Sequence, residues 1–200
     1  MRLVDVGPLI LGHRLSTRET LNAYGTLIYN KGALVLRMLH FLFTNPATGD
    51  GQPFFDMMSD FVKRHKDGWA TTETFMQVAS EHFAGTPIAR KYGLTDLNWF
   101  FRQWVFQAHH PTYRMSYQVQ GQPDGSAIVQ GTVFQENAPE KWFMVLPLVL
   151  SFGKDKKARG TVSVTGAQTP FSIKLPSRPE SAELDPDMWV LSEKTSTKKQ

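Results

Sequence analysis

The pattern of apolar residues changes near residue 111, and this change constrains the fold of the chain more than any other feature. Before that point, apolar residues recur every three or four positions, a spacing that places them on one face of a helix. After it, they alternate with polar residues, as in strands with one buried face. Helices followed by strands indicate an α + β chain of two modules rather than one sheet of alternating strands and helices.

Helices are expected at about residues 21–43, 52–65, 71–83 and 96–107. The first is apolar around so much of its circumference that it should be mostly buried. It should end at Asn45, because Pro46 disfavours helical geometry in the residue before it. Thr71 is expected to cap the third helix, since its hydroxyl can accept a hydrogen bond from a free backbone N–H of the first turn.

Strands are expected at about residues 113–119, 127–135, 143–152, 161–165, 170–175 and 181–184. Short strands at this spacing are typical of an antiparallel sandwich. Pro147 suggests an edge or a bulge, because proline cannot donate to a strand ladder. The expected organisation is a helical module over residues 1–110, a β-sandwich over 111–191 and a disordered tail over 192–200.

Composition excludes several classes of function. The formal net charge is +4, but three lysines of that balance lie in the polar tail, so nucleic-acid binding is not expected. The absence of cysteine excludes disulfides and cysteine-based zinc sites. No apolar run approaches the ~20 residues of a membrane-spanning helix. The charged run from Lys154 to Arg159 reads as a solvated hairpin turn.

Motifs for common chemistries are absent from the sequence. The histidines include no pair at the spacing of a zinc-binding H-E-x-x-H helix, and there is no nucleophile elbow or glycine-rich phosphate loop. His109 and His110 are adjacent, so their side chains should diverge rather than share a metal. The aromatic residues between Trp99 and Phe106 have helical spacing and should be core rather than a stacking platform. Periodicity alone therefore names no function.

Residues 28–39, which read IYNKGALVLRML, resemble a known signature. It is the Y-x-K-G-A-x-V-x-x-M-L motif of the gluzincin zinc aminopeptidases, the family of membrane alanyl aminopeptidase. Residues 7–16, GPLILGHRLS, resemble the G-P-L-x-L-G-x-R-L-S stretch of bacterial members. Shorter matches at residues 71–75, 97–105, 111–113 and 183–186 extend the resemblance over about residues 7–191.

The resemblance implies a fold and an activity. The fold would be the helical lobe of a thermolysin-like domain followed by an antiparallel fibronectin-like β-sandwich. The parent enzyme would hydrolyse N-terminal residues from peptide substrates, using zinc held by an H-E-x-x-H motif and a further glutamate. By the same resemblance, Tyr29 is the catalytic residue that donates a hydrogen bond to the oxyanion of the tetrahedral intermediate. Tyr24, five positions earlier, lacks the motif and is expected to be structural.

The sequence also departs from the family. It lacks H-E-x-x-H, the third zinc glutamate and the G-x-M-E-N strand, all of which precede Gly7 in the family. We therefore expect a C-terminal fragment without metal ligands, inactive alone, whose partner is the missing N-terminal half of the peptidase. The alternative function is a non-catalytic helical-plus-sandwich binding or structural module. For Tyr29 itself, the alternative reading is a helix aromatic packed in a core.

Overall fold

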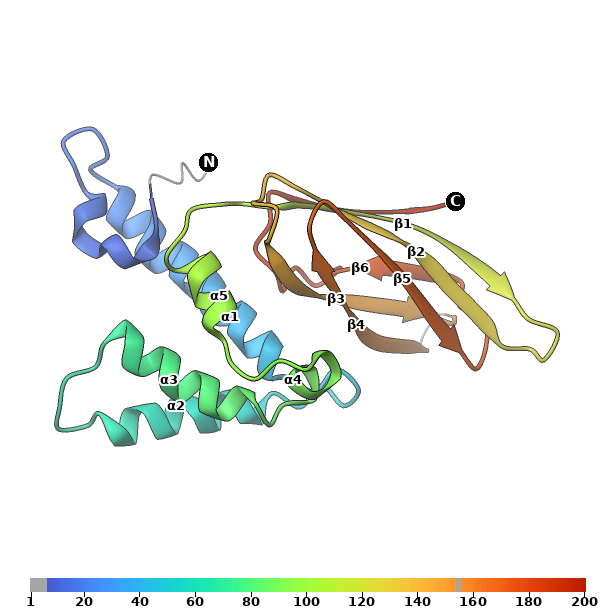
Figure 1. Cartoon of the computed structure of the whole chain (residues 1–200), viewed down its shortest axis with the longest axis horizontal. Helices are drawn as coiled ribbons and strands as arrows, with labels where there is room; N and C mark the ends of the chain where they lie inside the picture. The colour runs from blue at the N-terminus through green and yellow to red at the C-terminus, as the bar shows by residue number, and fades with distance from the viewer. Residues whose placement is uncertain (1–6, 154–155) are drawn as a thin grey trace. The chain divides into compact units, whose positions relative to one another are not determined.

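The computed structural model describes residues 7–153 and 156–200. The chain divides into two compact units between His109 and His110. The first unit holds the helices and the second holds the strands, so the chain is an α + β protein (Figure 1). The hairpin turn expected from Lys154 to Arg159 lies partly outside the described residues, at 154–155.

The helical unit begins with two irregular segments and continues with regular helices (Figure 1). Its elements are a 3₁₀ segment η1 (Leu9–Leu15), a π-helical segment η2 (Gly25–Lys31), α1 (Gly32–Phe43), α2 (Gln52–Arg64), α3 (Thr72–Phe83), α4 (Pro87–Tyr92) and α5 (Asn98–Trp104). The helix expected over residues 21–43 is thus divided: its first part is wound as a π-helix and only its second part is a regular α-helix.

The core of the helical unit is built on α1. Half of the 12 residues of this helix are buried, fewer than its broad apolar face predicts: they are Val35, Met38, Leu39, Phe41, Leu42 and Phe43. The predicted cap of α3 is confirmed, because the Thr71 hydroxyl accepts from the Thr74 N–H at 3.2 Å and the Thr74 hydroxyl accepts from the Thr71 N–H at 3.0 Å. This reciprocal pair satisfies two backbone donors of the first turn.

Two helices differ from expectation. α4 was not predicted: it starts at Pro87 behind a Thr86 cap and stops at Gly93, whose left-handed φ of 64° suits glycine. α5 starts at Asn98 and ends at Trp104, so it is shorter than the helix expected over residues 96–107. The Asp96 carboxylate accepts from the Asn98 N–H at 2.8 Å, which supports the start of α5.

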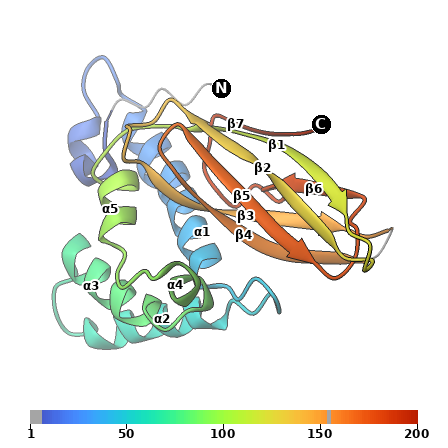
Figure 2. The ribbon, with the colours of Figure 1, turned by 45° about the vertical axis from the view of Figure 1, so that its right-hand side comes forward.

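The second unit contains two sheets (Figure 2). Its strands are β1 (Thr112–Gly121), β2 (Ala127–Glu136), β3 (Phe143–Ser151), β4 (Lys157–Thr165), β5 (Gln168–Leu175), β6 (Ser181–Leu184) and β7 (Lys194–Lys199). One sheet has the order β5-β2-β1-β7 and the other β4-β3-β6. Each strand expected before residue 192 is present, within a few residues of its predicted bounds.

The tail prediction was wrong. Residues 194–199 form β7, which pairs in parallel with β1 from Thr112↔Lys194 to Tyr117↔Lys199. The Glu193 N–H donates to the Pro111 carbonyl, and the Gln200 N–H donates to the Tyr117 carbonyl, both within 2.9 Å. Backbone pairing, rather than an apolar face, orders this segment.

Pro147 was expected at an edge or a bulge, and β3 as a whole is not an edge strand, because it lies between β4 and β6. Pairing of β3 with β6 runs from Leu148 to Ser151, so Pro147 lies just outside that ladder. Its carbonyl still accepts from the Asp185 N–H at 2.9 Å. A proline is tolerated here because no β6 residue needs its missing N–H.

The two sheets form the layers of a sandwich-like unit. Tyr113, Met115 and Tyr117 of β1 are buried, and so are Met144, Leu146 and Leu148 of β3. A hydrogen bond between a side chain and the backbone joins the sheets: the Tyr117 hydroxyl accepts from the Ala182 N–H of β6 at 2.9 Å. A buried phenol with a backbone partner fixes the register of the two layers.

Candidate functional site

Tyr29 lies on η2, the π-helical segment that leads into α1. The Gly32 N–H donates to the Leu27 carbonyl, which is the five-residue hydrogen bond of a π-turn. Leu27 and Lys31 are almost completely buried, whereas the Tyr29 side chain is 67% exposed. The inner face of the turn therefore anchors the backbone and the outer face presents the phenol. Short π-segments within helices occur frequently at functional sites.

An open groove of about 540 Å³ lies beside Tyr29 within the helical unit. Tyr29 is one of its lining residues, and most of the rest are apolar, including Ile28, Leu36, Phe75 and Phe101. Leu36 is 40% exposed, on the same helix that buries most of its other apolar side chains. The groove thus combines an apolar surface with one phenol that can donate a hydrogen bond.

One aromatic ring contacts Tyr29, and a second ring contacts the first. The Tyr24 ring meets the Tyr29 ring edge-on, with centroids 6.1 Å apart and an interplanar angle of 88°. The His13 ring stacks on Tyr24 at 4.1 Å and 9°. From the sequence, neither ring was expected to have a role at Tyr29. A five-residue spacing does not bring the Tyr24 and Tyr29 side chains together on a regular α-helix.

Lys31 was also assigned no role from the sequence, yet it is only 1% exposed. It follows Tyr29 by two positions, inside the matched motif. A lysine this buried is rare in proteins unless it is paired. The four-residue spacing from Leu27 already places it on the buried side of a helix; its burial was missed because a lysine is expected to be solvated.

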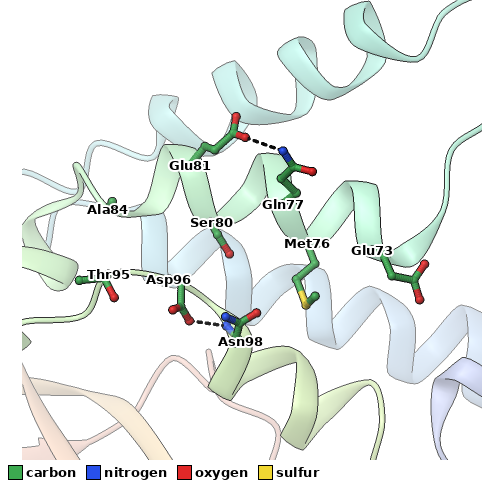
Figure 3. Close-up of a pocket in the computed structure, with 9 residues that line it drawn as sticks. All are labelled: Glu73, Met76, Gln77, Ser80, Glu81, Ala84, Thr95, Asp96 and Asn98. Atoms are coloured by element: carbon green, nitrogen blue, oxygen red, sulfur yellow. Dashed lines mark hydrogen bonds between the residues drawn. The ribbon is translucent and has the colours of Figure 1, made fainter.

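A second pocket, of about 520 Å³, lies between α3 and the segment that precedes α5 (Figure 3). Several of its polar groups have partners in the protein. Gln77 donates to Glu81 at 3.1 Å, and the Asp96 carboxylate accepts from the Asn98 N–H (Figure 3). The Ser80 hydroxyl accepts from the Leu97 N–H at 3.1 Å. The Arg64 guanidinium, followed by Gln77, lowers the pKa of Glu81. These contacts serve the packing of the unit.

Two histidines of the helical unit, His82 and His40, contact side chains within the unit. His82 is hydrogen-bonded to the Asp60 carboxylate at 2.8 Å. The His40 ring lies 5.0 Å from Phe54 and 5.2 Å from Phe55, and burial, followed by the charge of Arg37, lowers the pKa of His40. Across residues 7–153 and 156–200, no cluster of three or more His, Asp or Glu side chains is placed to hold a metal ion.

The aromatic stripe on α5 is core, as its spacing predicts. Phe100, Phe101 and Trp104 are buried, and the Phe101 ring packs edge-on against Phe75 of α3 at 6.0 Å. Phe106, beyond the end of α5, is 37% exposed. Phe100, Phe101 and Trp104 are therefore packed inside the helical unit and are not available to stack on a ligand.

Comparison with known proteins adds no assignment. No model of a known protein family matches the chain, and no curated protein is significantly similar to it. Within the part of the chain that the structure describes, no helix has the length and apolar character to cross a membrane.

Proposed function

We propose that this chain is the C-terminal part of a zinc-dependent aminopeptidase, with Tyr29 as the catalytic residue that it contributes. In this proposal the helical unit is the helical lobe of a thermolysin-like catalytic domain, and the second unit is its fibronectin-like β-sandwich. The substrates are peptides, from which the whole enzyme removes N-terminal residues. The proposal rests on the motif at residues 28–39 and on the position of Tyr29.

The exposure of Tyr29 is the observation that carries the proposal. A core aromatic, which is the alternative reading, would be buried like Phe43 or Trp104, each at 0% exposure. Tyr29 is 67% exposed on a turn whose opposite face is buried, and it lines an open groove. Its phenol is therefore free to meet a group that arrives from outside the helical unit.

The chemistry suggested for Tyr29 is hydrogen-bond donation. A neutral phenol donates one hydrogen bond through its O–H. Aimed at the carbonyl oxygen of the scissile peptide bond, it stabilises the negative charge that develops there as water adds to the carbonyl. A fixed donor of this kind acts only as charge appears, so it lowers the barrier without tightening substrate binding.

The zinc of the proposal does not fit the residues described here. No cluster of three potential ligands occurs among the described side chains, so the metal would be held by residues outside this sequence. Bound there, zinc would polarise the carbonyl and activate water. What this chain itself would supply is the phenol, the buried turn that holds it and the apolar groove beside it.

Replacing Tyr29 with phenylalanine in the full-length gene product tests the proposal. Tyr29→Phe keeps the ring and removes the donor, so we expect kcat to fall roughly 10²- to 10³-fold with KM and zinc content little changed. Tyr92→Phe, on α4 of the same unit, is the matched control and should retain wild-type kinetics. Equal kcat in the Tyr29→Phe and wild-type proteins would remove Tyr29 from the mechanism.

A non-catalytic binding module is the second candidate, and the open apolar groove favours it. A groove of about 540 Å³ with apolar lining can also bind a partner without chemistry. The two candidates predict different protein sequences upstream of this chain in its gene. An H-E-x-x-H motif encoded before residue 7 supports the peptidase, and a frame without one leaves the binding module.

A further inference from the structure

The rings of His13, Tyr24 and Tyr29 form a continuous row. His13 is stacked face-to-face on Tyr24, and Tyr24 meets Tyr29 edge-on. A centroid separation of 6.1 Å and a near-perpendicular angle are the preferred geometry of an aromatic pair, because the positive edge of one ring meets the negative face of the other. The row ends at the residue proposed to act on the substrate.

The π-turn is what brings Tyr24 and Tyr29 together. Residues five apart on a regular α-helix point about 140° away from one another, since each residue turns the chain by about 100°. Tyr24 immediately precedes η2 and Tyr29 lies within it, where a five-residue hydrogen bond replaces the usual four-residue one. The wider turn places positions five apart on nearly the same side. The irregular winding of η2 thus has a direct consequence for the Tyr29 ring.

The backbone under His13 is tied to the rest of the helical unit. The Ile10 N–H donates to the Val105 carbonyl at 3.1 Å, and Leu15 at the end of η1 is buried. Gly12, just before His13, has φ 54° and ψ −129°, which a residue with a side chain rarely adopts. The bend at Gly12 therefore sets the direction of the His13 ring on an anchored segment.

The loop from η1 to η2 is closed by its own hydroxyl groups. The Thr20 hydroxyl donates to the Leu15 carbonyl at 2.8 Å and accepts from the Thr17 N–H at 3.1 Å. The Ala23 N–H then donates to the Thr20 carbonyl at 2.9 Å. These bonds fix the path between the two ring-bearing segments, so His13 and Tyr24 meet as parts of one ordered loop.

We infer that Tyr24, supported by His13, is a positioning residue that holds the Tyr29 phenol in one orientation. This inference rests on the proposed function, because a held orientation matters only if Tyr29 meets a reacting group. Tyr29 is 67% exposed, so its ring has few other restraints on the solvent side. The edge-on contact with Tyr24 supplies one, and a donor that is already oriented loses less entropy when its hydrogen bond forms.

The test uses the 200-residue chain itself, with ¹³C-labelled tyrosine. Three-bond couplings measure how Tyr29 divides among its χ1 rotamers. In Tyr24→Leu, the ratio of the Tyr29 rotamer that contacts residue 24 to the other rotamers should fall about 2- to 13-fold. This is the range expected for loss of one aromatic pair. Tyr24→Phe keeps the ring and should restore the wild-type ratio. If Tyr24 serves only the packing of the loop, the Tyr29 rotamers should be the same in Tyr24→Leu as in the wild type.

Two further variants complete the test of Tyr24. Tyr92→Leu, on α4 of the same unit, should leave the Tyr29 rotamers unchanged. If Tyr24→Leu does not fold, His13→Ala replaces it, because His13 is exposed; it should broaden the rotamers of Tyr24 and, through Tyr24, those of Tyr29. Unchanged Tyr29 populations in a folded Tyr24→Leu or His13→Ala chain overturn the inference.

The two proposals fail separately. Rotamer populations are measured without substrate or metal, so they report on positioning alone. Tyr29→Phe kinetics in the full-length product report on the reaction. A Tyr29 ring that responds to Tyr24, in a protein whose kcat is unaffected by Tyr29→Phe, would keep the positioning and refute the catalytic role.

Discussion

Gly131 lies at a point where β2 and β1 approach each other too closely for any side chain. A Cβ atom added there would fall far inside van der Waals contact of the Ser116 carbonyl oxygen and 2.8 Å from the Tyr117 Cα atom. Both neighbours are backbone atoms of β1, so they cannot move aside as a flexible side chain would. The glycine therefore protects the position of Tyr117, whose hydroxyl joins the two sheets.

Gly131→Ala should lower the free energy of unfolding by about 1–3 kcal/mol, because the extra methyl group forces the β1–β2 pair apart. Gly160→Ala on β4 is the matched control, since no atom lies within 4 Å of an added Cβ there. It should be neutral or slightly stabilising. Urea denaturation of both variants measures the difference, and equal midpoints would contradict the close approach.

At the residue scale, sequence reasoning succeeded where a rule is local. The Thr71 cap follows from a hydroxyl next to free N–H groups, and it is present. The contact of Tyr24 with Tyr29 depends on the winding of η2. A π-turn and an α-turn share the same apolar residues, so composition does not distinguish them and this contact was not predictable.

β7 shows at the element scale how a strand can form without an apolar pattern. Its residues, from Lys194 to Lys199, are lysine, threonine and serine. The order comes from pairing with β1 and from one side chain that reaches the other sheet: the Thr197 hydroxyl accepts from the Leu184 N–H of β6 at 3.0 Å. Alternation of apolar residues predicted the other six strands but could not reveal this one.

Thr197→Val should destabilise the second unit by about 1–3 kcal/mol, because the partly buried Leu184 N–H loses its acceptor while the shape is kept. Thr197→Ser retains the hydroxyl and should recover most of that loss. Chemical denaturation of the three proteins measures the effect. A Thr197→Val chain as stable as wild type would show that β7 does not link the sheets.

α2 and α3 are joined by a group of charges. Asp60 lies 2.6 Å from Arg64 and 2.8 Å from His82, and Arg64 also lies 2.6 Å from Glu81. The hydrogen bond from His82, and then that from Arg64, lowers the pKa of Asp60 below its ordinary 3.8. The contacts favour the ionised carboxylate in the folded state.

The sign of the pH effect follows from that lowered pKa. The Asp60 contribution to stability is present above pH 3.8, where the unfolded carboxyl ionises, and is lost as pH falls through the lower folded pKa. Asp60→Asn should therefore be less stable than wild type at neutral pH, and the difference should shrink as the pH falls below 3.8. Thermal unfolding of both proteins across this range measures it. A gap that stays constant with pH would contradict the assignment.

At the scale of the whole molecule, the chain places its helices and strands in separate units that divide between His109 and His110. The change of period near residue 111 lies beside this division, because each kind of element imposes its own spacing on apolar residues. The function is a different matter. Periodicity names no reaction, and the proposed activity depends on the motif around Tyr29 and on zinc ligands, of which the described residues form no cluster.

Hydrolysis of a leucyl anilide by the full-length gene product is the most direct test of the proposed aminopeptidase. The same substrate with an acetylated amino group is the comparison, because an aminopeptidase requires the free amine. We predict one zinc ion per chain, release of the aniline only from the free-amine substrate, and neither zinc nor hydrolysis for the 200-residue chain alone. A full-length product that binds no zinc and cleaves neither substrate would contradict the account.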